Sequence, residues 1–294
     1  MEIDRRELKR QAREAIRVSR PSFWVVTLVY LLMTTGVSTL AGLLVPAPDT
    51  GNISLPALFL SILLSLYSTV VGFGFTLWSM WTSRKLSPGL GALADGFSVA
   101  LLVIMTSILI FLHTLAWSLL CIPVVWLVLI PVLLSPGLSF LVIPVLIAGI
   151  MIFSYWVSLR YALAYYLLAD HPDHGAFAAV RRSVELTRGW KWEMFKLFFS
   201  FLGWELLDLL LYTLVLVQVL VQGGFFQSLS LEHYGAAYVL YQIILSYPSS
   251  ALLLLLASIP VKLWLYPYRS VTMAGFYDAR LRLQREGSVE MPPL

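Results

Sequence analysis

Residues 98–134 read SVALLVIMTSILIFLHTLAWSLLCIPVVWLVLIPVLL and contain no Asp, Glu, Lys or Arg. An α-helix rises about 1.5 Å per residue, so this stretch is longer than the ~30 Å hydrocarbon core of a bilayer requires. Pro123 and Pro131 interrupt it. We therefore expect either one kinked span that reaches residue 134, or a span over 98–122 followed by an irregular segment.

Similar apolar runs recur along the whole chain. A hydrophobic fraction of 59% and a mean hydropathy of +0.84 exclude an ordinary soluble domain. The runs predict an all-α integral membrane protein with six transmembrane helices, in a single membrane domain that covers residues 1–294. The expected spans are about 22–45, 56–82, 98–122 or to 134, 137–160, 195–222 and 238–265.

The 20 Lys and Arg residues can all lie on one side of a membrane. They fall before the first span, in the second and fourth connections, and at the ends of the fourth and sixth spans. The connections around 46–55, 135–136 and 223–237 contain none. The positive-inside rule then places both termini, the connection 161–194 and a C-terminal tail 268–294 in the cytoplasm. We expect a multi-pass membrane protein.

Two stretches before spans have the pattern of amphipathic helices. In residues 2–20, Leu8, Ala12 and Ile16 mark one face, while basic residues crowd the other. This is typical of a helix lying in the cytoplasmic interface. Residues 175–190 repeat the theme, and 83–97 form a weaker copy. The sequence therefore suggests three repeats, each an interfacial helix followed by a transmembrane hairpin.

A set of residues in the second half of the chain has a familiar order. They are Tyr165 to Asp170 with Pro172, then Ser183, Gly189, Lys191 and Phe195, then Ser200-Phe201-Leu202-Gly203-Trp204, and finally Pro267-Tyr268 and Phe276-Tyr277. This order resembles the bacterial integral membrane family called "domain of unknown function 975", most specifically over 161–204. The resemblance implies a six-span bacterial membrane protein and assigns no catalytic residues.

Glu205 and Asp208 do not belong to that family pattern, and their spacing puts both on one helix face. If the fifth span starts near Phe195, Glu205 lies near mid-membrane, at a depth similar to His113. An acid beside a His could relay protons. Alternatively, the acids pair structurally with each other, with His113 or with a backbone carbonyl.

A third arrangement starts the fifth span later. The two acids then face a cavity open to the cytoplasm, within reach of Arg160 or Lys262.

Basic and aromatic residues alternate in the fourth connection. They are Arg181, Arg182, Arg188, Trp190, Lys191 and Trp192. Together they are candidates for a rim that binds lipid headgroups or a protein partner. Simple anchoring at the membrane interface is the alternative interpretation.

Asp170, His171 and His174 are weak candidates for a metal site, because two imidazoles and two carboxylates lie within five residues. Adjacent ligands rarely reach tetrahedral geometry, so we expect Asp173 to cap the following helix instead. Cys121 is the only cysteine and cannot form an internal disulfide. We expect no cofactor and no nucleic-acid partner.

The chain contains no hydrolase motif and no phosphate-binding loop. We therefore expect a non-enzymatic membrane protein that binds lipids, in particular anionic ones, or a partner, or that has a scaffolding or protective role in the bilayer. The alternative is a small proton-coupled transporter or permease that uses Glu205, Asp208 and His113. Homo-oligomerisation stays open.

Overall fold

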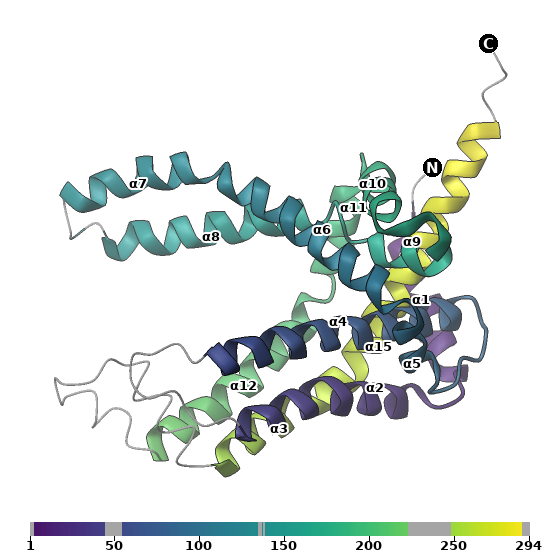
Figure 1. Ribbon diagram of the computed structural model, residues 1–294, viewed down its shortest axis with the longest axis horizontal. Coiled ribbons are helices and arrows are strands. Elements are labelled where there is room, and N and C mark those ends of the chain that lie inside the picture. Colours follow the sequence, from purple (N-terminus) through teal and green to yellow (C-terminus); the bar gives the residue numbers. More distant parts are fainter. Residues whose placement is uncertain (1–2, 45–54, 135–136, 138, 223–247, 290–294) are drawn as a thin grey trace.

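The computed structural model describes residues 3–44, 55–134, 137, 139–222 and 248–289. Every regular element in these ranges is a helix. The long apolar helices extend in one direction from a compact end built of shorter helices (Figure 1). The extended helices are α2 (Phe23–Leu31), α3 (Val37–Leu44), α4 (Leu55–Ser83), α6 (Ala100–Leu119), α7 (Ile122–Leu134), α8 (Ser139–Ser158) and α12 (Leu202–Gln222).

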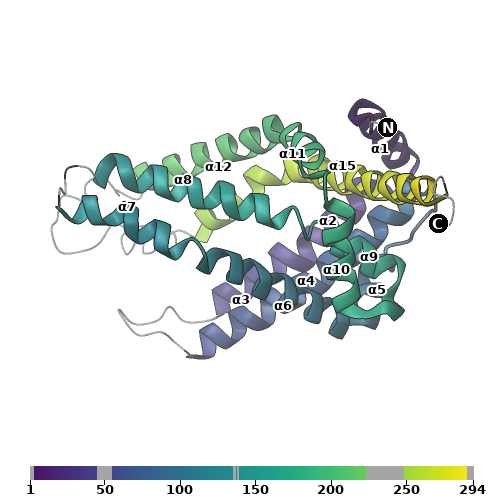
Figure 2. The same cartoon turned by 90° about the horizontal axis from the view of Figure 1, so that it is seen from above.

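Shorter helices gather at the other end, as Figure 2 also shows. They are α1 (Arg5–Val18), α5 (Ala92–Asp95), α9 (Ala164–Asp170), α10 (Gly175–Thr187) and α11 (Lys191–Phe199). A π-helical turn, Leu32–Gly36, joins α2 to α3, and short 3-10 helices cover Gly96–Val99 and Pro172–His174. Helix α15 (Pro248–Val289) extends from the long helices to the compact end (Figure 1).

Within the described residues, four helical stretches are long and apolar enough to cross a membrane. They are Phe23–Gly42, Leu55–Ser83, Ala92–Ile130 and Leu202–Gln222, with a shorter apolar helix over Val142–Ser158. Leu127, Val145 and Ile152 on the extended helices are 70–72% exposed, as suits contact with lipid. The all-helical membrane class is thus supported, whereas the six-span layout stays a prediction. The connections 46–55, 135–136 and 223–237, and part of the sixth predicted span, include residues outside the described ranges.

The apolar stretch 98–134 is helical on both sides of a short break at Leu120–Cys121. The expected irregular segment after residue 122 is therefore wrong, because α7 continues to Leu134. Pro123 lies in the first turn of α7, where its missing N–H removes no hydrogen bond within the helix.

The core sits at the compact end. Leu8, Ala12 and Ile16 of α1 are buried, as the amphipathic pattern predicted, and α1 packs against α15 and α4. Trp78 near the end of α4 and Leu168 of α9 are completely buried in the same core. These apolar contacts hold the chain's first helix against its last.

The stretch assigned to a C-terminal tail continues as helix. Helix α15 includes Pro260 and Pro267 and ends only at Val289. Tyr268, Phe276 and Tyr277 are buried in the core. The second half of α15 is therefore a structural element of the compact end.

Helix α4 packs against residues 92–99, which comprise α5 and the 3-10 helix after it and are called the α5 segment below. The two backbones approach each other closely at two glycines. A Cβ on Gly74 would overlap the carbonyl group of Leu93, and a Cβ on Gly96 would lie 2.6 Å from the carbonyl oxygen of Val70. Only glycine allows this approach, which is a common way for membrane helices to pack closely.

We expect Gly74→Ala to destabilise the protein by roughly 1–3 kcal/mol, because the added methyl group overpacks a rigid backbone contact. Gly72→Ala in the same helix is the control. Its Cβ would meet only the Tyr30 hydroxyl at 3.9 Å, so it should keep or raise stability through helix propensity. Thermal unfolding in one detergent compares the variants. Equal midpoints would contradict the close contact.

Candidate functional site

Glu205 lies in the first turn of α12, because the chain turns at Ser200–Phe201 and the helix begins at Leu202. The predicted start near Phe195 is wrong, and with it the placement of Glu205 ten residues into a continuous span. The Glu205 Oε1 atom accepts a hydrogen bond of 2.7 Å from Arg269 Nη1 of α15. An acid in the first helical turn also interacts favourably with the helix dipole.

Asp208 lies on the same face and also meets α15. Its Oδ2 atom is 3.9 Å from Lys262 Nζ, which donates a 2.9 Å hydrogen bond to Ser258 Oγ. The Asp208 Oδ1 atom is buried and has no hydrogen-bond partner among the described residues. Two carboxylates of α12 thus pair with two cations of α15, and Lys262 is the partner that the third sequence interpretation named.

His113 and Arg160 belong to a different cluster. The His113 ring lies 5.8 Å from the ring of Tyr161, and its Nδ1 atom is 2.7 Å from the carbonyl oxygen of Leu109. The Arg160 guanidinium lies 4.8 Å from the ring centre of Trp117. None of the contacts described for these two residues involves Glu205 or Asp208, so the structure does not assemble the predicted relay.

Arg160 is also tied to α10 through its backbone. Its carbonyl oxygen accepts hydrogen bonds from Ser183 (2.9 Å) and Thr187 (3.3 Å). Its side-chain Nε atom is buried and has no hydrogen-bond partner within the described part of the chain. The guanidinium therefore keeps an unused donor beside Trp117.

Three predicted rim residues take part in contacts between cations and aromatic rings. Lys191 Nζ lies 5.8 Å from the ring centre of Trp156, and Arg280 lies 4.4 Å from that of Trp190. Trp192 has Lys196 Nζ at 5.8 Å from its ring. A cation over an aromatic face contributes about 0.5–1 kcal/mol at exposed sites.

The three arginines of the rim are less constrained. Arg181 forms a 3.3 Å ion pair with Glu185 one turn later, and both side chains are exposed. Arg182 is half-buried and Arg188 is exposed at the end of α10. Exposed pairs of this kind add little stability, so these charges are available to solvent or lipid.

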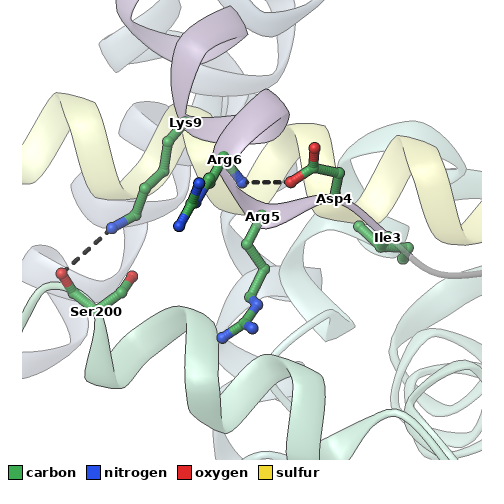
Figure 3. A pocket seen from close by; sticks show the side chains of 6 residues that line it. All are labelled: Ile3, Asp4, Arg5, Arg6, Lys9 and Ser200. Carbon is green, nitrogen blue, oxygen red and sulfur yellow. Dashed lines mark hydrogen bonds between the residues drawn. The ribbon is translucent and has the colours of Figure 1, made fainter.

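A basic hollow that the sequence did not single out lies between α1 and the turn before α12 (Figure 3). Arg5, Arg6 and Lys9 line this space of about 510 Å³ together with Ser200. Lys9 Nζ donates to the Ser200 carbonyl oxygen at 3.2 Å, and burial, followed by the nearby Arg13 and Arg5 charges, lowers the pKa of Lys9. An anion in this hollow would relieve the repulsion.

Arg84 joins three segments that are far apart in sequence. Its guanidinium donates to Asp170 Oδ1 of α9 at 2.7 Å and to Asp278 Oδ1 of α15 at 2.8 Å. Tyr277 donates to Asp170 Oδ2 at 3.1 Å. Burial raises the pKa of Asp170, but Arg84 outweighs this effect and the net pKa is lowered. The sequence shows basic and acidic residues at the ends of these helices, but it does not show that they contact one another in the folded protein.

The weak metal candidates do not converge. Asp170 is engaged by Arg84, while the His171 and His174 rings lie 5.1 Å apart on an exposed segment. Among the described residues, no three His, Cys, Asp or Glu side chains form a metal-binding group. The expected cap by Asp173 is wrong, since His174 occupies the cap position of α10 without a side-chain hydrogen bond.

Comparison with known proteins identifies the class of this membrane protein. Residues 1–283 match the family described as "Protein of unknown function (DUF975)", so the chain belongs to that family. The resemblance noted in the sequence is thereby confirmed. Neither the curated proteins nor the solved structures contain a match to the chain.

We expect Arg84→Gln to lower the free energy of unfolding by roughly 1.5–3 kcal/mol, because two charge-assisted hydrogen bonds are lost. Lys85→Gln removes the same charge at the neighbouring exposed position and should have little effect. Thermal or chemical unfolding in one detergent measures both.

The difference between the parent and Arg84→Gln should also depend on pH. A lowered pKa in the folded state stabilises the protein above the unfolded Asp pKa of about 3.9, and this contribution is lost as pH falls through the folded value. The two proteins should therefore converge below about pH 4. A difference that is constant down to pH 2 would contradict the role of Asp170.

The double variant Glu205→Gln/Asp208→Asn should be less stable than the parent by roughly 1–3 kcal/mol, because it leaves Arg269 and Lys262 without their carboxylates. Asp95→Asn/Asp173→Asn makes the same charge change at exposed positions and serves as the control. Unfolding midpoints at two pH values test this. Equal or greater stability would mean that the acids are retained for an activity at an energetic cost.

Proposed function

We propose that this chain is a non-enzymatic protein of the bacterial cytoplasmic membrane whose basic rim binds anionic lipid headgroups. The observation that carries the proposal is the series of cations placed over aromatic rings. Arg160 lies over Trp117, Lys191 over Trp156, and Arg280 over Trp190.

Tryptophan prefers the headgroup level of a bilayer, where its ring is half apolar and its N–H can reach water. A cation held over such a ring is placed at the same level. Each basic residue near an anionic leaflet contributes about 1 kcal/mol of attraction. The hollow formed by Arg5, Arg6 and Lys9 adds a further group of positive charges.

The proposed topology has six spans with both termini in the cytoplasm. It is supported by the gathering of α1, α9, α10 and the end of α15 at one end of the molecule (Figure 1). Three hairpin repeats remain part of the proposal. Helix α1 directly precedes an apolar stretch, whereas the short α11 separates α10 from α12, and α5 is much shorter than either. A protein partner or a second copy of the chain could also use the rim.

The pairing of Glu205 with Arg269 and of Asp208 with Lys262 supports a structural role for these carboxylates over transport. Polar pairs between helices are a normal means of association in the membrane. A proton-coupled transporter needs titratable groups that exchange one partner for another during transport. Ion pairs between these carboxylates and cations oppose such an exchange.

The proposal is tested by quenching of tryptophan fluorescence with brominated lipids after reconstitution. We expect brominated phosphatidylglycerol to compete several-fold better than brominated phosphatidylcholine. Lys191→Gln/Lys196→Gln should reduce this preference by about fivefold or more, as the loss of ~1 kcal/mol per charge predicts. Equal competition by both lipids in the parent would overturn the proposal.

The control is Arg17→Gln/Lys85→Gln, which makes the same change in net charge. Both positions are exposed and lie outside the contacts between cations and tryptophan rings described above. This variant should keep most of the preference, because the placed cations are intact.

A further inference from the structure

A cavity with several charged side chains in a largely apolar lining opens between α6, α10 and the turn after α8. It measures about 800 Å³, and its lining includes His113, Trp117, Arg160, Tyr161 and Arg181. Glu185 also lines it and pairs with Arg181 at 3.3 Å. The lining thus includes two guanidinium groups and one carboxylate, and this excess of positive charge suits an anion.

A second cavity, of about 870 Å³, begins where the first ends. Trp117 lines both. The second one follows the end of α6 and the facing sides of α7 and α8, and its lining is almost entirely apolar, from Leu120 and Val124 on one side to Val145 and Phe153 on the other. The two cavities adjoin at Trp117 and are together called the groove below; one end carries charged side chains and the other end is apolar.

The charged end suits a phosphate. The Arg160 Nε atom is buried without a hydrogen-bond partner in the described ranges, while Trp117 fixes the plane of its guanidinium. The planar donor fork of arginine matches the oxygen spacing of a phosphate group. A phosphate oxygen in the cavity would accept hydrogen bonds from the Arg160 guanidinium, which lines it.

The apolar end suits a single acyl chain. From Trp117 to Val128 the helices rise about 16 Å, which is close to half of the ~30 Å hydrocarbon core and thus to the depth of one leaflet. Gly149 lines this part, and a Cβ at this position would meet no atom within 4 Å. The missing side chain leaves room along α8.

We propose that this groove binds one anionic phospholipid, with its phosphate against Arg160 and Arg181 and one acyl chain between α7 and α8. This proposal rests on the function proposed above, because both take an anionic lipid as the ligand. It differs in assigning one site that holds one lipid per chain. The groove is distinct from the contacts that Lys191, Lys196 and Arg280 make elsewhere on the rim.

The first test fills the apolar end. Gly149→Leu places a side chain in the groove and should also favour the helix. Gly42→Leu is the matched control, because it makes the same substitution in a helix at an exposed glycine whose Cβ would also meet nothing within 4 Å. Each protein is purified from bacteria that contain phosphatidylglycerol and phosphatidylethanolamine. Native mass spectrometry then counts the lipids that remain bound.

We expect the parent and Gly42→Leu to retain one phosphatidylglycerol, and Gly149→Leu to lose it at least tenfold with an unchanged unfolding midpoint. Arg160→Gln should keep a lipid but lose the preference for phosphatidylglycerol over phosphatidylethanolamine. Lys85→Gln, at an exposed position outside both the rim and the cavity lining, should behave like the parent. Equal retention by the parent and Gly149→Leu would overturn the site, as would a parent that retains phosphatidylethanolamine.

The fluorescence preference of the same proteins separates the two proposals. If Gly149→Leu loses the retained lipid but keeps the preference for brominated phosphatidylglycerol, both proposals stand. If the parent shows no preference but Gly149→Leu still loses a lipid, the rim proposal fails and the groove stands. If the preference persists and Gly149→Leu retains its lipid, only the groove proposal fails.

Discussion

Helices that project into lipid gain little by burying apolar surface against one another, because acyl chains are as apolar as leucine side chains. Close backbone contact and polar pairs must supply the association instead. Gly74 and Gly96 provide the close backbone contact, where α4 meets the α5 segment. The polar pairs between α12 and α15 are Glu205–Arg269 and Asp208–Lys262. The compact end, where Arg84 joins α4, α9 and α15, fixes how these helices emerge.

Much of the fold followed from local patterns. Uncharged runs predicted membrane helices, and the spacing of Leu8, Ala12 and Ile16 predicted the buried face of α1, because both signals lie within a single element. The end of the last helix was misjudged, since Pro267 within an α-helix usually marks a boundary. Tertiary packing of Phe276 and Tyr277 outweighs that local preference.

The candidate site was less predictable, because it depends on contacts between distant segments. Lys262 was named as a partner for the α12 acids, and the structure confirms its approach to Asp208. The partnership of Glu205 with Arg269 was not foreseen, because the start of α12 depends on the turn at Ser200–Phe201. Trp117 and Arg160 lie far apart in the sequence. Only the fold places Arg160 on Trp117.

The packing of α1 against α15 also has a consequence for biosynthesis. Helix α1 is made well before its partner surface on α15, where Gly275 lies opposite Leu8, because the two helices lie far apart along the chain. At about 5–20 residues per second, α1 waits more than ten seconds for that partner. During this time its apolar face needs another cover, and the membrane surface provides one. The contact between α1 and α15 therefore forms after the helices between them have been made.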